Sequence, residues 1–235
     1  MRSIIAAIVF VFVTILLSLL SIPAALFDRS GSAYLWLARI WSKIFLLLFG
    51  VNLKISGLEN IHKSEHYVFV VNHSSYTDIP IIFAAIPKDV RLILRKRLTR
   101  IPIWGWALML SPMIIIDRSN PSKAKKTLAN AIEIVRKGAS VLLFPEGTRT
   151  TTGELQSFKR GAFHMAYESG AKVVPVAIKG SFDLMPRSAK LPSPNKTVHV
   201  SIGQTLEVNP EIENDRQREM DLMSRAEESV RKMLG

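Results

Sequence analysis

The sequence predicts an α/β fold in which a mixed, largely parallel sheet is flanked by helices and preceded by an N-terminal two-helix membrane hairpin. Three observations predict this fold: a long uncharged N-terminal segment, seven short β-branched runs after residue 50, and helical segments between those runs. The length of 235 residues suits one domain with a small addition. We therefore divide the chain into a membrane-anchoring hairpin, residues 1–50, and an α/β domain, residues 51–235.

The N-terminal segment has the length of a membrane anchor. No charged residue occurs in Ser3–Phe27, a stretch that as a helix would extend about 37 Å at roughly 1.5 Å per residue. A cleaved signal peptide and a buried helix of a soluble core are the alternatives, and the length of the uncharged run disfavours both. The polar connector 28–32 leads into a second apolar stretch, Ala33–Gly50, in which Arg39 and Lys43 give one face the character of an interfacial helix.

Two helices joined by a short connector return the chain to the side of the membrane on which it began. Basic residues are concentrated on that side, so the positive-inside tendency predicts a membrane-associated protein with its domain on the cytoplasmic face. The 31 Lys and Arg residues exceed the 19 Asp and Glu residues, and the net charge of +12 indicates an anionic partner or surface. The absence of cysteine excludes a disulfide framework, a thiolate metal site and a cysteine nucleophile.

Short β-branched runs predict the strands of the sheet, and several are apolar throughout, as strands covered on both faces are. The predicted strands are Val51–Ser56, Tyr67–Val71, Arg91–Leu94, Met113–Ile116, Val141–Phe144, Val173–Ile178 and Val198–Ile202. A helix is predicted after Asn120, a suitable N-cap, with Pro121 at its first position and Gly138 at its end. The spacing of Met223, Ala226, Val230 and Met233 predicts a C-terminal helix.

Several catalytic and nucleotide-binding signatures are absent. The chain contains no G-x-S-x-G elbow, no G-x-x-x-x-G-K-[ST] loop and no G-x-G-x-x-G run. His62 and His66 are four residues apart, but no zinc signature surrounds them, and we predict neither a metal nor a cofactor. His164 and His199 are isolated and are interpreted as structural or surface residues.

The remaining histidine, His73, directly follows the apolar strand Tyr67–Val71, where α/β folds commonly place active-site residues. His73 and Asp78 can meet only if His73 lies in a loop and Asp78 lies in the first turn of a helix. The carboxylate would then hold one ring nitrogen and leave the other as a base. The alternative is an N-cap aspartate and a loop histidine that make no contact.

A second polar block lies at the end of the predicted strand Val141–Phe144. The residues that follow are Pro145, Glu146, Gly147, Thr148 and Arg149, in which the glycine permits close approach of the backbone. Arg118 follows another predicted strand, and Lys159 opens a predicted helix. We expect Arg118, Arg149 and Lys159 to converge at the strand ends and form a site of phosphate size.

These blocks, in this order, resemble the motifs of the glycerolipid acyltransferases over about residues 51–205. The four matching blocks are His73-x4-Asp78, Ile116-x-Arg118, Phe144 to Arg149, and Val174 to Ile178. The resemblance implies that His73 and Asp78 form the catalytic pair, that Arg118, Glu146 and Arg149 serve the acceptor, and that Pro175 is structural or near the acyl site. We add Gly147, Thr148 and Lys159 as substrate-binding residues.

The short, membrane-anchored chain is most similar to the 1-acylglycerol-3-phosphate acyltransferases of that family. This similarity implies transfer of a fatty acyl group from acyl-CoA or acyl carrier protein to the 2-hydroxyl of 1-acylglycerol 3-phosphate (lysophosphatidic acid), which gives phosphatidic acid for phospholipid biosynthesis. His73 would remove the hydroxyl proton while Asp78 holds the tautomer, without an acyl-enzyme. Another lysophospholipid or glycerol 3-phosphate as the acceptor, and a non-catalytic lipid-binding membrane protein, are the alternatives.

A basic segment precedes two tryptophans, Trp104 and Trp106. Its charged residues are Lys88, Arg91, Arg95, Lys96, Arg97 and Arg100. This combination indicates contact with an anionic membrane interface or an acidic carrier protein, and a solvated loop before a core helix is the alternative. We expect membrane lipids as a partner and no nucleic acid, since neither the anchor nor the His73 block would have a role in binding nucleic acid.

Overall fold

The computed structural model describes residues 2–28, 30–117 and 119–235. Its sheet has the spatial order β1-β7-β6-β2-β5-β3-β4. The strands are β1 (Asn52–Ser56), β2 (Tyr67–Val71), β3 (Val90–Arg95), β4 (Ile114–Ile116), β5 (Ser140–Leu143), β6 (Lys172–Lys179) and β7 (Thr197–Ile202). The pair β6 and β7 is antiparallel, whereas the other neighbouring pairs are parallel, which confirms the predicted mixed, largely parallel sheet.

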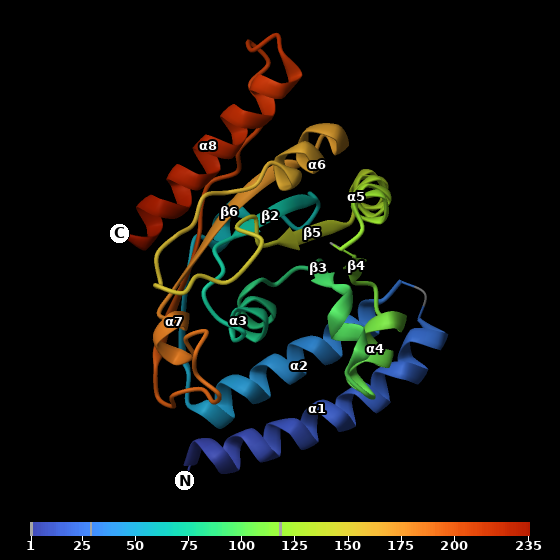
Figure 1. The fold of residues 1–235 in the computed structure, drawn as a ribbon, viewed down its shortest axis with the longest axis vertical. Coiled ribbons are helices and arrows are strands. Elements are labelled where there is room, and N and C mark those ends of the chain that lie inside the picture. The colour runs from blue at the N-terminus through green and yellow to red at the C-terminus, as the bar shows by residue number, and fades with distance from the viewer. Residues whose placement is uncertain (1, 29, 118) are drawn as a thin grey trace.

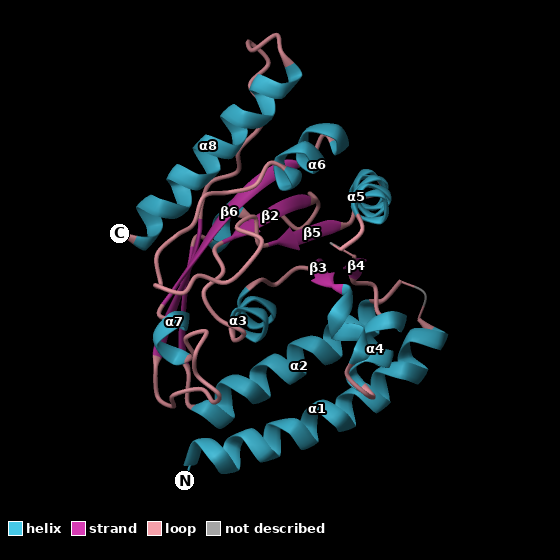
Figure 2. Ribbon diagram, viewed as in Figure 1, coloured by secondary structure: helices cyan, strands magenta, loops and turns pink. Residues whose placement is uncertain are grey.

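Helices cover both faces of this sheet (Figure 1). On one side lie α1 (Arg2–Phe27), α2 (Ser32–Phe49), α3 (Asp78–Ala85) and α4 (Trp104–Leu110). On the other side lie α5 (Pro121–Arg136), α6 (Gly161–Ser169) and α8 (Asp215–Leu234), while the short α7 (Ser181–Leu184) follows β6. Figure 2 shows the strands between these two helical layers. The 3-10 turns η1 (Leu58–Asn60) and η2 (Lys96–Arg100) complete the regular elements.

Each predicted strand begins and ends within one residue of the observed strand, whereas the C-terminal helix α8 begins at Asp215, eight residues before Met223. The Asn120 side chain accepts a hydrogen bond from the Lys123 amide at 3.0 Å, which confirms it as the N-cap of α5. Gly138, with a φ of +91°, follows the helix end as expected for a stop signal. Strand β2 is buried at every position because side chains from both helical layers pack on its two faces.

The N-terminal hairpin is packed against the domain along its length. Phe10 on α1 contacts Trp41 and Phe45 on α2, each with ring centroids 5.1 Å apart, and Phe45 and Phe49 belong to the same buried core as strand β2. The outward face of α1 is apolar and exposed, with Ile8 and Phe12 each 66% exposed. Both helices are long and apolar enough to cross a membrane by length and composition.

The sheet brings several loops to one edge. Because β2, β5, β3 and β4 are parallel neighbours, the segments that follow them leave at the same side of the sheet. These segments begin at Asn72, Phe144, Lys96 and Asp117. The two sequence blocks that contain His73 and Glu146 are therefore adjacent although 73 residues separate these two positions.

We expect Phe69→Ala to lower the free energy of unfolding by about 3–5 kcal/mol, since Phe69 is fully buried at the centre of the sheet. Phe12→Ala removes the same atoms from an exposed site and should change it by less than about 0.5 kcal/mol. Chemical unfolding in detergent micelles measures both variants. Equal losses in the two would contradict this assignment of the core.

Candidate active site

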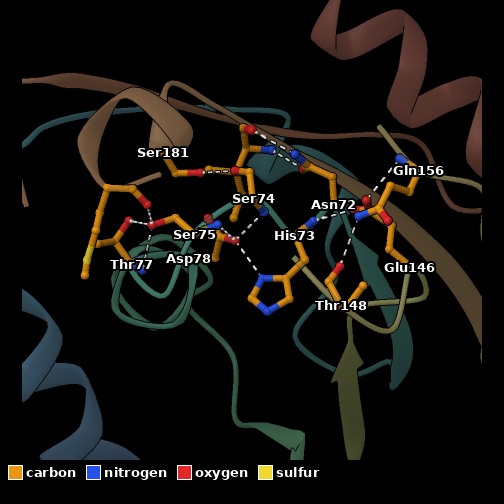
Figure 3. Close-up of polar contacts among 12 residues, drawn as sticks. Asn72, His73, Ser74, Ser75, Thr77, Asp78, Glu146, Thr148, Gln156 and Ser181 are labelled. Carbon is orange, nitrogen blue, oxygen red and sulfur yellow. Dashed lines mark hydrogen bonds and ion pairs between the residues drawn. The ribbon is translucent and has the colours of Figure 1, made fainter. Parts of the chain in front are cut away.

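The candidate site begins where strand β2 ends. The Asn72 amide joins this end to β6, since its nitrogen donates to the Ile178 carbonyl at 3.0 Å and its oxygen accepts from the Ile178 amide at 2.7 Å. His73 follows in the loop, and Asp78 is the first residue of α3. The His73 Nδ1 lies 2.8 Å from the Asp78 Oδ2 (Figure 3), so the two side chains meet in the geometry that the sequence requires.

The Asp78 carboxylate is fully buried and fixed by its own loop. The backbone amides of Ser74 and Ser75 each donate to Oδ2 at 2.9 Å, the same oxygen that faces the histidine. Three polar groups therefore contact one oxygen of Asp78. A hydrogen bond from Nδ1 to this oxygen would hold the His73 ring in one tautomer, in which Nε2 carries no proton.

The free edge of the His73 ring faces away from Asp78. Figure 3 shows Nε2 on the far side of the ring, and it forms no hydrogen bond within the described part of the chain. The side chain is 17% exposed, so a solvent-borne group can reach it. The ring stacks on Phe144 at 4.0 Å between centroids and 17° between planes, which restricts its rotation.

The Glu146 carboxylate contacts the backbone of His73. Its Oε1 accepts from the His73 amide at 2.5 Å and its Oε2 accepts from the Gln156 amide at 3.0 Å, and the residue is 3% exposed. Burial raises the pKa of this carboxyl to about 7, outweighing the two backbone donors, which lower it. The sequence predicts acceptor binding for Glu146, whereas the structure turns both of its oxygens toward the backbone.

Arg149 reaches the site from the same loop. Its guanidinium carbon lies 3.3 Å from the centre of the Tyr76 ring, and its Nη1 is buried without a hydrogen-bond partner among the described residues. The next residue, Thr150, donates its amide to the His73 carbonyl at 3.0 Å, which ties this loop to the histidine. Arg149 therefore lies in a loop that is bonded to His73, whereas its convergence with Arg118 and Lys159 stays a prediction.

The sequence also predicts substrate binding by Gly147, Thr148 and Lys159, and each of these residues makes a backbone hydrogen bond near the site. The Arg95 side chain donates to the Gly147 carbonyl, and the Thr148 carbonyl accepts from the Gln156 side chain at 3.3 Å. The Lys159 amide donates to the Pro145 carbonyl at 3.0 Å, so its backbone borders the site, but its side chain is exposed. Arg118 lies outside the described residues.

Sequence reasoning missed three side chains at this edge. Tyr76 lies inside the His73-x4-Asp78 block, where its aromatic ring was the available signal. Arg95 lies in the basic segment that we assigned to a membrane or carrier surface, and its position as the last residue of β3 was the clue. Arg187, which donates to the Arg149 carbonyl at 3.4 Å, lies in a loop without any pattern that predicts a site.

An apolar cavity lies between the hairpin and the sheet. Its interior volume is about 70 Å³. Its walls come from α1, α2, α3, α4 and β3, and include Leu17, Trp41, Ile79, Phe83 and Leu94. Ile79 directly follows Asp78 in α3 and Leu94 directly precedes Arg95 in β3, although neither His73 nor Asp78 itself lines the cavity.

The buried Glu146 predicts a pH-dependent stability. Since its folded pKa of about 7 exceeds the ordinary value of 4.5, its contribution to stability is greatest below about pH 4.5 and is lost as the pH rises through 7. We expect the free energy of unfolding of the wild type to fall by up to about 3 kcal/mol over this window relative to Glu146→Gln, which does not titrate. Chemical unfolding at pH 5 and pH 8 measures the difference, and a pH-independent difference would contradict the raised pKa.

Comparison with known proteins finds a matching family and several relatives of this chain. The family model described as acyltransferase matches residues 52–179. The chain is 36% identical over 156 residues to a chloroplastic 1-acyl-sn-glycerol-3-phosphate acyltransferase of Arabidopsis thaliana, covering 66% of this chain and 43% of that one. It is 32% identical over 180 residues to the 1-acyl-sn-glycerol-3-phosphate acyltransferase of Pseudomonas aeruginosa, covering 75% and 65%.

A third such relative, from Saccharomyces cerevisiae, is 34% identical over 168 residues, covering 70% of this chain and 55% of that one. The matched chain thus spans about half the length of the curated relatives. The crystal structure of the 1-acyl-sn-glycerophosphate (LPA) acyltransferase PlsC from Thermotoga maritima shares the fold, with a TM-score of 0.80, 23% identity and coverage of 99% of this chain and 98% of that one. Since the family match covers more than half of the sequence, the chain belongs to the acyltransferase family.

Proposed function

We propose that this protein transfers a fatty acyl group from a thioester donor to the 2-hydroxyl of 1-acylglycerol 3-phosphate and so forms phosphatidic acid. The observation that carries the proposal is the 2.8 Å contact of His73 Nδ1 with the buried Asp78, which leaves Nε2 as a base beside the Arg149 cation. The relatives that carry the name of this activity support the choice of acceptor.

In the proposed reaction, His73 Nε2 removes the proton from the acceptor hydroxyl as its oxygen attacks the thioester carbonyl carbon. The carbon–sulfur bond then breaks, and the departing thiolate takes a proton from the imidazolium. Asp78 stabilises the positive charge on the ring between these two steps. Acyl-CoA and acyl carrier protein both present such a thioester, so either donor fits this chemistry, and no cofactor takes part.

The acceptor phosphate is assigned to the cationic side of the site. Arg149 offers an unpartnered N–H, and charge-assisted hydrogen bonds from guanidinium to phosphate are strong and directional. Arg118, Gly147, Thr148 and Lys159 are proposed to contribute around it. Holding the phosphate in one place fixes which hydroxyl reaches His73, and this determines the position that is acylated.

The apolar cavity is the proposed site of an acyl chain. Its walls of Leu17, Trp41, Ile79 and Phe83 offer carbon surface rather than charge, as a fatty chain requires. Ile79, the residue after Asp78, is one of its walls, and under this proposal the polar end of the chain lies toward His73. The walls contributed by α1 and α2 give the hairpin a part in substrate binding.

We propose that residues 1–50 anchor the α/β domain, residues 51–235, to a membrane without projecting across it. Helix α1 packs lengthwise on α2 and α4, with Phe10 turned inward and Ile8 and Phe12 turned outward. A helix with one apolar face free along its length suits insertion parallel to the surface. The excess of basic residues favours the anionic cytoplasmic face.

The base assignment predicts that His73→Ala lowers kcat by about 10²–10⁴-fold with purified protein in detergent, given lysophosphatidate and acyl-CoA or acyl carrier protein. Asp78→Asn should give a smaller but severe loss, because the tautomer of His73 is then no longer held. His199→Ala is the control, since this histidine is exposed on β7. Wild-type turnover by His73→Ala would exclude the mechanism, and no acylation of lysophosphatidate by the wild type would exclude the function.

The anchoring surface predicts that the double substitution Ile8→Glu and Phe12→Glu releases the protein from anionic lipid vesicles in a flotation assay. Both side chains are exposed, so the fold should survive while two charges oppose burial in lipid. The control is Ile8→Leu with Phe12→Leu, which keeps the surface apolar. Unchanged flotation of the glutamate variant would contradict a membrane contact through this face.

A further inference from the structure

We infer that Arg187 and Arg97 join Arg149 in a three-arginine site that selects acceptors carrying a phosphomonoester. The inference deepens the proposed function, on which it rests, by assigning specificity to two residues outside the four sequence blocks. Arg187 lies between α7 and β7, beyond the residues 52–179 that match the family. Arg97 lies in η2, two residues after Arg95, whose side chain donates to the Gly147 carbonyl in the loop that contains Arg149.

The segment that contains Arg187 is attached to the loop that contains His73. The Ser75 hydroxyl donates to the Met185 carbonyl at 2.8 Å, and the Ser74 and Ser181 hydroxyls are 2.7 Å apart (Figure 3). Two residues later, Arg187 Nη1 donates to the Arg149 carbonyl at 3.4 Å. Arg187 is therefore placed at the site by bonds to both loops that build it.

Arg149 is oriented for a ligand and lacks one in the protein. Its guanidinium lies on the face of Tyr76 at 3.3 Å, which fixes the plane of its N–H groups. Its Nη1 is buried without a hydrogen-bond partner in the described ranges, and an unpaired buried donor is costly. An oxygen acceptor from a bound molecule would satisfy this N–H.

The positive charge of these three arginines is not balanced by acids. None of them forms an ion pair with a carboxylate in the part of the chain that the structure describes, whereas other arginines do, such as Arg39 with Asp89 at 2.8 Å. Burial lowers the pKa of Arg149, and the charges of Arg187 and Arg97 lower it further, while Asp78 and Tyr76 oppose the shift. Such a cluster is stabilised by an anion.

A phosphomonoester fits this cluster better than a phosphodiester does. Its charge is about −1.5 to −2 at pH 7 and it offers three acceptor oxygens, whereas a phosphodiester carries a single charge. Arg149 is half-buried, and Arg187 and Arg97 are exposed around it, where a headgroup attached to the phosphate would otherwise lie. The three cations therefore favour a terminal phosphate over a substituted one.

The test compares Arg187→Ala with Lys190→Ala, an exposed cation of the same segment. We expect Arg187→Ala to lower kcat/KM about 10-fold for lysophosphatidate, with less than a 3-fold change for lysophosphatidylcholine and for the KM of the acyl donor. Arg97→Ala should act in the same direction, Arg187→Lys should recover part of the loss, and Lys190→Ala should leave all these values unchanged. The wild type should prefer the monoester, and this preference should shrink in Arg187→Ala.

An equal loss of kcat/KM with both acceptors in Arg187→Ala would show that Arg187 has a structural role. No loss of kcat/KM with either acceptor would show that Arg187 does not belong to the site. Both results overturn the inference while acylation of lysophosphatidate by the wild type upholds the proposed function. A second measurement does not depend on turnover: inorganic phosphate should raise the thermal unfolding midpoint of the wild type and of Lys190→Ala, and raise that of Arg187→Ala less. Equal shifts in all three proteins would also overturn the inference.

Discussion

Burial of the Asp78 carboxylate is the constraint on which the rest of the site depends. A charge without solvent is costly unless hydrogen bonds replace its water. Here the amides of Ser74 and Ser75 and the His73 ring contact Oδ2, while Oδ1 is buried without a partner among the described residues. Asp78 is also in the first turn of α3, where the helix dipole favours a negative charge. The loop from His73 to Asp78 can therefore take few conformations, and the ring of His73 is positioned by the same bonds that stabilise the aspartate.

A second buried carboxylate extends this constraint to the neighbouring strand. The Glu146 carboxylate accepts a hydrogen bond from the His73 amide, so this side chain joins the loop after β5 to the loop after β2. Burial raises the pKa of Glu146, and the charge of Asp78 adds to this rise. Burial and the charges of Arg187 and Arg97 lower the pKa of Arg149, whereas Asp78 favours the charged form of Arg149.

The sequence predicts the parts of this structure that depend on local patterns. Strand β2 could be predicted because every residue from Tyr67 to Val71 is apolar, and the N-cap of α5 because Asn120 precedes Pro121. The contact of His73 with Asp78 could be predicted because Asp78 follows His73 by five positions, between the end of a strand and the start of a helix. These features depend on residues that are close together in the sequence.

Features that depend on distant segments could not be predicted in this way. Nothing in the spacing of Glu146 shows that its carboxylate turns toward the His73 backbone, because that orientation depends on how the loops after β2 and β5 pack together. The segment of Arg187 is brought to the site by two hydrogen bonds between residues far apart in the sequence. The Ser75 hydroxyl donates to the Met185 carbonyl, and the Arg187 side chain donates to the Arg149 carbonyl. The hairpin was predicted as an anchor, yet Phe45 and Phe49 also complete the core of the sheet, a role that hydropathy alone does not distinguish from lipid contact.

The shared core of hairpin and sheet has a consequence for a lipid substrate. An acyl chain that left a membrane through water would expose each methylene at a cost of about 0.8 kcal/mol, or roughly 10 kcal/mol for a dozen. In this protein the apolar cavity has α1 and α2 as one wall and the α3 and β3 residues next to Asp78 and Arg95 as the other. Under the proposed function, a chain in this cavity would contact carbon surface that the hairpin and the domain contribute together. A domain tethered by a flexible linker would lack this shared wall.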